Sequence, residues 1–317
     1  TMALYVFGPV PSRRLGRSVG INNIPPKTCS YGCIYCQVGR TTHVQTRRQA
    51  FFEPDELLRQ VREKLNQLHQ ANENVDILTV VPDGEPTLDS QLGALVDKLK
   101  TLDLPVAVIT NASLLWEPSV RDDLMSADWV SLKIDAVSEA LWRTINRPAR
   151  DLELPIVLEG MKLFAKEFSG TLVTESMFVN DLNEHLLHAS QLAEFIKTLN
   201  PEIAYIAIPT RPPAVRTVKP ADSEALARIY HTFKQQELHA EYLIGYEGNA
   251  FASSGNVKDD LLSITAVHPM RQDAVQELLR RTHTPWQSVE DLLSQNQLVK
   301  IEFDNSVYYA RQLESRT

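Results

Sequence analysis

All three cysteines of the chain lie within eight residues of one another, at Cys29, Cys33 and Cys36. Thiolates at this C-x3-C-x2-C spacing can bind three irons of a [4Fe-4S] cube, and the chain has no fourth cysteine for the remaining iron. A zinc site completed by His43 and a purely structural role for buried thiols are the alternatives. Zinc sites more often pair C-x2-C knuckles, and structural cysteines are not expected to gather in one polar, glycine-containing loop. The spacing therefore favours an iron–sulfur cluster with one open iron.

Length and composition bound the class of protein. A chain of 317 residues, 43% hydrophobic, is long enough for one large barrel-type domain and a small appended one. It has no run approaching the ~20 apolar residues that span a bilayer, and no basic-then-apolar signal pattern at its start. We therefore expect a cytoplasmic protein without membrane association, in a reducing compartment that keeps the thiols available as ligands.

Positive charge is concentrated at the start of the chain. The formal net charge is −8, yet residues 1–52 hold seven arginines and lysines and no acidic residue. This basic segment could receive a phosphate-bearing substrate, or it could offset the negative charge of a thiolate-ligated cluster. Charge runs specify partners poorly, so both interpretations stay open.

Between residues 17 and 236 short apolar runs alternate with amphipathic stretches, a pattern typical of parallel β/α architecture. Six strands are predicted, at Arg17–Ile24, Val75–Pro82, Pro105–Thr110, Trp129–Asp135, Thr171–Val179 and Ile203–Pro209. Helices are predicted at Pro54–Gln70, Ser90–Leu102 and Asn183–Leu199, the last with Asn183 as its cap. In barrels of this class the chemistry lies at the C-terminal ends of the strands, and the cysteine loop follows the first strand as that rule requires.

The pattern changes after residue 237. A short strand at Glu241–Ile244 ends the predicted barrel of residues 1–245, and a connector with glycines and serines follows over residues 246–260. The remainder, residues 261–317, is predicted to form two helices and a hairpin, at Arg271–Thr282, Ser288–Gln295, Leu298–Phe303 and Ser306–Arg311. This succession resembles a small winged helix. Residues 256–317 hold seven basic and nine acidic side chains, so a protein-contacting or lid role is as open as RNA binding.

The cysteine loop, with Tyr35 directly before its last cysteine, resembles the signature of the radical S-adenosylmethionine (radical SAM) superfamily. The resemblance implies an α/β fold with a partial (β/α)6 TIM-like barrel. It also implies that the amino and carboxylate groups of SAM chelate the open iron of a [4Fe-4S] cluster. One electron from that cluster then cleaves SAM to a 5′-deoxyadenosyl radical that abstracts hydrogen. A flavodoxin or ferredoxin is the electron donor that such an enzyme implies.

A second element supports the resemblance about 50 residues after the cysteines. Gly84, Glu85 and Pro86, at the end of the second predicted strand, are similar to the Gly-Gly-Glu-Pro element with which the family binds the SAM ammonium group. Asp83 stands where the first glycine usually lies. The alternative is an ordinary strand-to-helix turn in which Asp83 and Thr87 cap the next helix.

Polar residues on the third and fourth predicted strands extend the candidate cofactor site. Asn111, directly after the third strand, is expected to contact the ribose or the carboxylate of SAM. Ser131, Lys133 and Asp135 share one face of the fourth strand, so that face is expected to meet a wet or charged cavity. The alternative for Lys133 and Asp135 is a mutual ion pair that closes the barrel.

Three arginines are candidate substrate ligands. Arg211 follows the sixth strand in a proline-rich turn, and Arg13 and Arg14 lie in the basic segment. Guanidinium groups bind phosphates and carboxylates bidentately, although a solvated Arg211 is an equal alternative. On the fifth strand, period-two alternation leaves open whether Glu175 faces the interior.

Residues 8–18, 25–28 and 39–42 narrow the resemblance to radical SAM proteins related to the tRNA wybutosine-synthesis enzyme, which forms a tricyclic base. That enzyme uses a second cluster from additional cysteines, which this chain does not have. Three classes of function follow. They are radical modification of a base in tRNA or another structured RNA, modification of a protein or small molecule, and a non-catalytic regulator that senses the cluster or SAM. The balance of charge in residues 256–317 makes specific DNA binding the least favoured.

Overall fold

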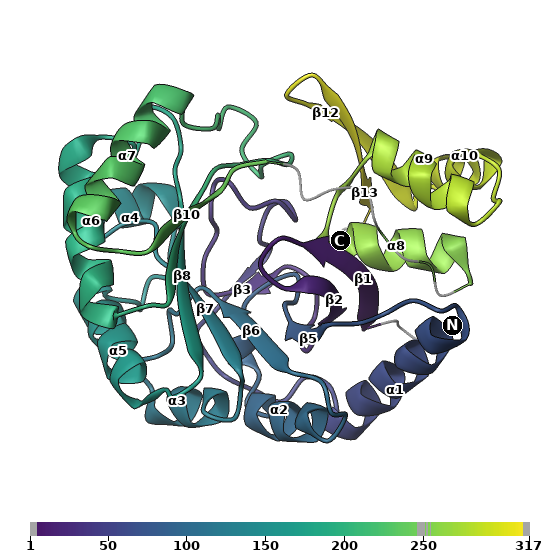
Figure 1. The fold of residues 1–317 in the computed structure, drawn as a ribbon, viewed down its shortest axis with the longest axis horizontal. Coiled ribbons are helices and arrows are strands. Elements are labelled where there is room, and N and C mark those ends of the chain that lie inside the picture. The colour runs from purple at the N-terminus through teal and green to yellow at the C-terminus, as the bar shows by residue number, and fades with distance from the viewer. Residues whose placement is uncertain (1–4, 246–250, 252, 254, 313–317) are drawn as a thin grey trace.

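The computed structural model describes residues 5–245, 251, 253 and 255–312 of the chain (Figure 1). Its centre is an eight-stranded sheet with the order β1-β2-β5-β6-β7-β8-β9-β10. The first pair, β1 with β2, is antiparallel, and every following neighbour pair is parallel. The strands are β1 Val6–Ser12, β2 Gly16–Ile21, β5 Ile77–Val80, β6 Val106–Thr110, β7 Trp129–Lys133, β8 Thr171–Met177, β9 Ile203–Ala207 and β10 Ala240–Leu243. The spatial order follows the chain because successive β/α units each add one strand.

Helices cover the outer, convex side of this sheet, as Figure 1 shows. They are α1 Pro54–Gln70, α2 Leu92–Lys100, α3 Pro118–Leu124, α4 Glu139–Ile145, α5 Leu154–Glu167, α6 Leu186–Leu199 and α7 Ser223–Gln235, with the 3-10 helix η1 at Pro86–Leu88. The main hydrophobic core lies between the two layers and includes Leu78, Val108 and Leu132 from strands and Leu95 from α2. None of the described helices is long and apolar enough to cross a membrane.

The predicted parallel β/α architecture is confirmed, because the six predicted strands correspond to β2 and to β5 through β9. The short strand predicted near residue 241 is β10, and α1 has the predicted bounds. Sequence analysis did not predict β1, which contains Pro9 and Pro11. Prolines argue against a strand, and they are tolerated here because β1 is the edge of the sheet.

The prediction that Asn183 caps a helix is wrong. The helix α6 begins at Leu186, and no side chain caps its first residue. The buried Asn183 instead donates from Nδ2 to the backbone oxygens of Asp135, at 3.1 Å, and Met177, at 2.8 Å. Its Oδ1 accepts from the backbone nitrogen of Val179 at 2.8 Å. Asn183 therefore joins the ends of β7 and β8, where backbone groups would otherwise lack partners.

The C-terminal unit, defined here as residues 257–312, is built from three helices and a small antiparallel sheet. Its elements are α8 Val257–Val267, β11 Met270–Arg271, α9 Gln272–Arg281, α10 Gln287–Ser294, β12 Leu298–Phe303 and β13 Ser306–Arg311. The sheet order is β11-β13-β12. Sequence analysis predicted α9, α10, β12 and β13 but not α8, which starts within the predicted connector. Residues 246–250, 252 and 254 of that connector lie outside the described residues.

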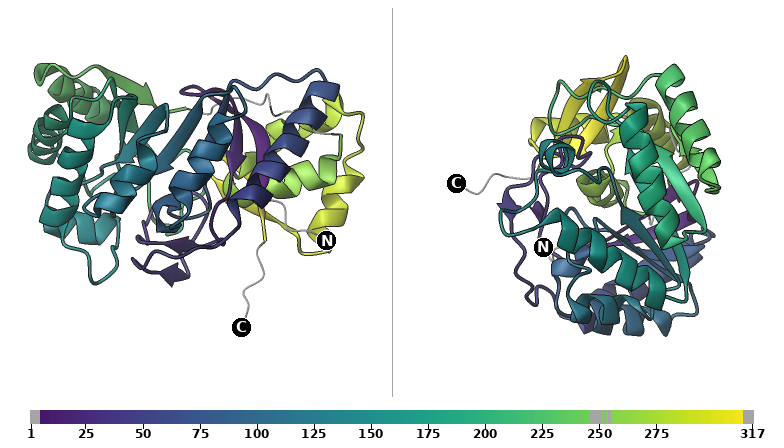
Figure 2. Two further views of the ribbon diagram at one scale, coloured as in Figure 1. Left: turned by 90° about the horizontal axis from the view of Figure 1, so that it is seen from below. Right: turned by 90° about the vertical axis from the view of Figure 1, so that its left-hand side faces the viewer.

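The C-terminal unit packs on the edge strand of the main sheet. Figures 1 and 2 both place α8 beside β1, and Phe7 and Val10 of β1 share a hydrophobic core with Leu261 and Val275 of this unit. A buried ion pair of 2.9 Å between Lys64 of α1 and Asp260 of α8 adds a polar link. The unit therefore covers a sheet edge that would otherwise expose unpaired backbone groups. The remaining two-residue strands, β3 Thr28–Cys29 and β4 His43–Val44, pair with each other in the cysteine loop region.

Candidate active site

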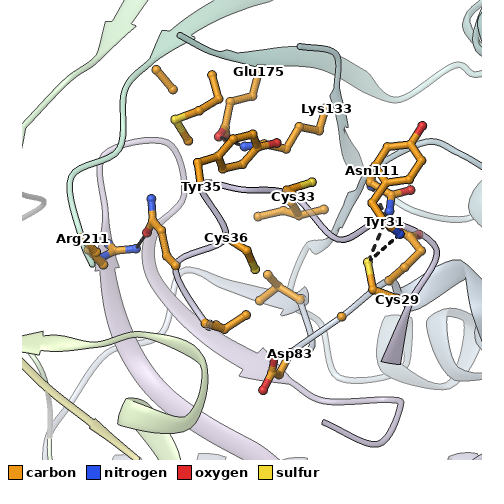
Figure 3. A pocket seen from close by; sticks show the side chains of 18 of the residues that line it. Cys29, Tyr31, Cys33, Tyr35, Cys36, Asp83, Asn111, Lys133, Glu175 and Arg211 are labelled. Carbon is orange, nitrogen blue, oxygen red and sulfur yellow. Dashed lines mark hydrogen bonds and ion pairs between the residues drawn. The ribbon is translucent and has the colours of Figure 1, made fainter. Parts of the chain in front are cut away.

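A cavity of about 290 Å³ lies at the C-terminal ends of the main-sheet strands (Figure 3). Residues at or just after the ends of β5 to β10 line it, as the barrel rule predicts. Most of the predicted site residues meet there: Arg13, Arg14, Cys29, Cys33, Tyr35, Cys36, Gly84, Glu85, Asn111, Lys133 and Arg211. The other three, Pro86, Ser131 and Asp135, are buried but do not line it.

The three cysteine side chains share this cavity, and hydrogen bonds reach their sulfurs. The sulfur of Cys29 accepts from the backbone nitrogen of Tyr31 at 3.4 Å and from Nδ2 of Asn111 at 3.5 Å. The sulfur of Cys33 accepts from Nδ2 of Asn146 at 3.5 Å. Such bonds to ligand sulfurs are among the means by which proteins tune iron–sulfur clusters.

Burial makes the three free thiols poor acids. It raises the pKa of Cys29 well above its usual value, raises that of Cys33 to about 12, and raises that of Cys36. Thiolates in this pocket therefore need a cationic partner, which iron ions supply. Cys29, Cys33 and Cys36 thus fit the donor set of a three-cysteine cluster.

His43 is not placed to be the fourth ligand of a zinc ion bound by the three cysteines. His43 is exposed on β4, its Nδ1 lies 3.0 Å from the hydroxyl of Thr42, and it does not line the cavity. Within residues 5–245, 251, 253 and 255–312, no three histidine, cysteine, aspartate or glutamate side chains converge closely enough to hold one metal ion. A single tetrahedral zinc ion needs such convergence.

The turn at Gly84 packs backbone to backbone against the cysteine loop. The backbone nitrogen of Glu85 donates to the oxygen of Thr28 at 3.1 Å, and that of Lys27 donates to the oxygen of Asp83 at 2.8 Å. A Cβ at Gly84 would lie 1.8 Å from the Thr28 oxygen, and the φ of Gly84 is +155°. Only glycine meets both demands, so this position fixes how closely the two segments approach.

Glu85 connects the ends of β5 and β6. Its Oε1 accepts from the backbone nitrogen of Thr87 at 3.0 Å and from the hydroxyls of Thr87 and Thr110, both at 2.6 Å. Its Oε2 accepts from the backbone nitrogen of Asn111 at 2.7 Å. Burial raises the pKa of Glu85 while these bonds oppose that shift. Glu85 also caps η1, a task that the turn alternative gave to Asp83 and Thr87.

Lys133 belongs to a buried ion-pair network that sequence analysis did not predict. Its Nζ lies 2.6 Å from Oε1 of Glu175, and Oε2 of the same carboxylate lies 2.6 Å from Nη1 of Arg14. Burial alone would raise the pKa of Glu175, but the charges of Lys133 and Arg14 lower it to about 2. The Lys133 ammonium also lies 5.0 Å from the centre of the Tyr35 ring.

The signal that points to Glu175 is its register. β7 and β8 pair Lys133 with Glu175, so an inward-facing Lys133 places the Glu175 side chain in the same interior. The alternative of a Lys133–Asp135 ion pair is wrong, because the partner of Lys133 is this cross-strand carboxylate.

Asp135 is buried behind Tyr35, one of the residues that line the cavity. Its carboxylate accepts hydrogen bonds from the hydroxyl of Tyr35, from Nδ2 of Asn146 at 2.6 Å and from the backbone nitrogen of Met177 at 2.8 Å. Because Asn146 also donates to Cys33, Asp135 is connected to the cysteine loop through two side chains. Asp135 therefore supports residues that line the cavity and does not line it itself.

The remaining arginines lie around the cavity in different settings. Nη2 of Arg13 donates to the backbone oxygen of Gly245 at 3.2 Å, which joins the β1–β2 turn to the chain after β10. Nη1 of Arg211 donates to Oε1 of Gln37 at 2.6 Å. Next to Arg211, the oxygen of Thr210 accepts from the hydroxyl of Tyr308 at 3.0 Å, so the C-terminal unit contacts the same loop.

The fold and the three-thiol cavity define an enzyme of the iron–sulfur and SAM-dependent class. The family model of the radical SAM superfamily matches residues 23–193, and the chain belongs to that superfamily. Its cofactors are a [4Fe-4S] cluster and SAM, and its general chemistry is reductive SAM cleavage.

The chain is also similar to individual proteins, one in sequence and two in structure. It is 43% identical over 312 residues to a UPF0026 protein of Methanocaldococcus jannaschii, covering 98% of this chain and 97% of that protein. The structure of Streptococcus suis SuiB bound to precursor peptide SuiA has a TM-score of 0.54 at 15% identity, covering 72% of this chain and 49% of that one. A structure of TYW1 with a lysine–pyruvate adduct bound has a TM-score of 0.49 at 13% identity, covering 93% of this chain and 80% of that one. At that level the expected relation to wybutosine synthesis stays a prediction.

Proposed function

We propose that Cys29, Cys33 and Cys36 hold three irons of the cluster and that SAM binds in the same cavity. The observation that carries the proposal is the meeting of all three thiols of the chain in one cavity with the Gly84–Glu85 turn. Lining residues that would contact SAM are Tyr35, Gly84, Glu85, Asn111 and Lys133. Pro86, Ser131 and Asp135 would position these residues from the buried layer behind them. When bound, the two cofactors supply one-electron cleavage of SAM and a radical that abstracts hydrogen.

Two buried carboxylates, Glu85 and Glu175, would position the residues around the cofactors in the absence of substrate. Glu85 fixes the backbone of Asn111 through a 2.7 Å bond, and Asn111 reaches Cys29, so one carboxylate orders both the SAM side and the cluster side. Glu175 keeps Lys133 in place as a cation beside Tyr35. Glu85 and Glu175 are both buried, so their hydrogen bonds and ion pairs would hold the neighbouring groups in place without a bound substrate.

We propose a base of tRNA or another structured RNA as the substrate. Support comes from the basic residues 1–52 and from Arg13 and Arg211 at the cavity, which suit phosphate groups. The cavity is a concave site at the C-terminal ends of the strands, not a groove that would hold a helix, so a base would have to be extruded to reach it, which is how enzymes reach bases in structured nucleic acids.

A small anionic molecule, or a residue of a protein, is the second candidate. The observation that favours it is the placement of Arg14, whose side chain is only 11% exposed and paired with Glu175. A cation at that depth suits a carboxylate inside the cavity better than a phosphate on a large surface.

We also propose that residues 261–317 form a winged-helix-like domain. The order of helices and strands from α8 to β13 supports this, because three helices with a three-stranded antiparallel sheet are its usual components. Seven basic against nine acidic residues over 256–317 favour a wall of the cavity entrance or a protein contact over general nucleic-acid binding. The Tyr308–Thr210 bond suits the role of a wall.

The test is 5′-deoxyadenosine formation by anaerobically reconstituted, dithionite-reduced protein, with and without total tRNA. Stimulation by tRNA, together with loss of the product in a Cys33→Ala variant, is the expected result. If 5′-deoxyadenosine forms at the same rate with and without tRNA, the proposal of an RNA substrate is overturned while the cofactor assignment stands. Small anions and peptides would then be the next substrates to assay. No formation by protein with an intact cluster would overturn the proposed site.

A further inference from the structure

A buried asparagine connects one of the cysteine sulfurs to a buried carboxylate. Nδ2 of Asn146 lies 3.5 Å from the sulfur of Cys33 and donates to Oδ2 of Asp135 at 2.6 Å. Asn146 and Asp135 are 3% and 2% exposed, and neither lines the cavity. Both hydrogen bonds therefore lie in the interior of the protein, where electrostatic interactions are weakly screened.

Backbone pairing with the cysteine loop fixes the place of Asn146. The backbone nitrogen of Ile34 donates to the oxygen of Ile145 at 2.9 Å, and that of Gly32 donates to the oxygen of Asn146 at 3.0 Å. Gly32 and Ile34 flank the cysteine whose sulfur Asn146 contacts. The next residue, Arg147, has a φ of +46°, a left-handed conformation that costs free energy in a non-glycine residue. The segment that carries Asn146 is therefore held against the cysteine loop.

The carboxylate of Asp135 determines which way the Asn146 amide points. If its nitrogen and oxygen were exchanged, Oδ1 of Asn146 would face Oδ2 of Asp135, and two acceptors repel each other. In the observed orientation Oδ1 is buried, and no group within the described ranges donates to it. A buried carbonyl without a donor costs free energy. This cost indicates that the position serves donation by Nδ2 towards the carboxylate and the sulfur.

Asp135 has the hydrogen-bonding pattern of an ionised carboxylate. Besides Asn146, the hydroxyl of Tyr35 donates to Oδ2, and the backbone nitrogen of Met177 donates to Oδ1 at 2.8 Å. All three partners are donors, so both carboxylate oxygens act as acceptors. A negative charge therefore lies one amide group away from the sulfur of Cys33.

We propose that Asp135 and Asn146 together set the reduction potential of the cluster that Cys33 helps to bind. The proposal rests on the proposed function, because it requires a cluster at the three cysteines. Hydrogen bonds to ligand sulfurs and the net charge around a cluster are two of the means by which proteins set its potential.

The two residues act on the potential in opposite directions. A donor to the sulfur stabilises the reduced cluster, which carries one more electron, so Asn146 raises the potential. Asp135 is a positioning residue that aims the Asn146 amide, and its charge destabilises the reduced cluster. The charge has the larger effect, because a full charge in the protein interior acts more strongly than one hydrogen bond. Asp135 therefore makes the reduced cluster a stronger one-electron donor.

The test is a redox titration of the reconstituted protein without SAM. Dithionite, acting through mediator dyes, supplies the electron that converts [4Fe-4S]²⁺ to [4Fe-4S]⁺, and electron paramagnetic resonance measures the reduced fraction. Asn146→Leu removes the donor to the sulfur, and Asp135→Asn removes the charge with little change of shape. The matched control is a second buried pair, in which Nδ2 of Asn23 donates to Oδ2 of Asp89 at 3.1 Å and neither side chain lines the cavity. Iron and sulfide analysis and a melting curve accompany each variant.

At the wild-type midpoint potential, the ratio of reduced to oxidised cluster should fall about fivefold in Asn146→Leu, or about 40 mV for a one-electron couple. In Asp135→Asn the same ratio should rise about fivefold or more. The control variants Asn23→Leu and Asp89→Asn should have the wild-type midpoint. Loss of packing alone does not predict shifts of opposite sign, so unchanged midpoints or two shifts of the same sign would overturn the proposal.

Two outcomes need separate treatment. If Asp135→Asn or Asn146→Leu does not fold, Asn146→Ser removes the same donor with a smaller side chain, and a midpoint that stays or rises in that variant overturns the proposal. Wild-type protein that retains all three cysteines but assembles no [4Fe-4S] cluster would instead overturn the proposed function.

Discussion

Replacing Gly84 by alanine should uncouple the cofactor turn from the cysteine loop. The new Cβ would lie 1.8 Å from the backbone oxygen of Thr28 and 2.8 Å from Cδ1 of Ile24, in a residue with φ of +155°. Overpacking against a backbone atom costs about 1–3 kcal/mol, and strain at a positive φ adds about 1–3 kcal/mol. We therefore expect a loss of ~3 kcal/mol or more, which lowers the melting temperature by about 4–5 °C or more in a protein of 317 residues.

The assay pairs a melting curve with iron and sulfide analysis after anaerobic reconstitution. Two glycine variants separate the causes. Gly32→Ala, in the cysteine loop, meets nothing closer than 3.7 Å and should behave as the wild type. Gly255→Ala has a φ of +100° but no atom within 4 Å, so it reports the strain alone. A Gly84→Ala protein with full cluster content and an unchanged melting temperature would refute the close-approach argument.

Three further perturbations test other parts of the account. Cys33→Ala should leave the chain folded but abolish cluster assembly, which iron analysis and absorbance near 400 nm would detect; a fully loaded variant would contradict the ligand assignment. Glu175→Gln removes the anion between Arg14 and Lys133 and should cost about 3–5 kcal/mol, measured by urea unfolding at pH 7. Because the pKa of Glu175 is lowered to about 2, its contribution is present above the unfolded-state pKa of about 4 and is lost as pH falls towards 2. The wild-type and Glu175→Gln stabilities should therefore converge in acid, and a constant difference between them would contradict the network. Lys64→Ala leaves Asp260 buried without its cation and should make the C-terminal unit susceptible to limited proteolysis, whereas a Lys64→Ala, Asp260→Ala double variant should recover part of the loss.

Local signals in the sequence predicted much of the fold. The apolar runs of β5 to β9 and the proline and acidic start of α1 each depend on neighbouring residues alone, and these elements appear where predicted. β1 was missed because its prolines are acceptable only at a sheet edge, and being an edge is a property of the whole sheet. Asn183 was misread for a similar reason, because its partners Asp135 and Met177 come from distant strands.

The candidate site divides in the same way. Cys29, Cys33 and Cys36 are recognisable because their spacing along the chain carries the chemistry, and the Gly84–Glu85 turn follows from a short motif. Glu175 lies 42 residues from Lys133 in sequence, and only the pairing of β7 with β8 brings the two together. No sequence pattern in one chain reports that register, so the network had to come from the structure.

The most direct test of the central claim is electron paramagnetic resonance of the reduced, reconstituted protein before and after SAM is added. A three-cysteine cluster with one open iron should give a [4Fe-4S]⁺ signal whose g-values change when SAM occupies that iron. The Lys133→Ala variant should need more SAM for the same change. A signal indifferent to saturating SAM, or no cluster signal from protein that retains all three cysteines, would contradict the account.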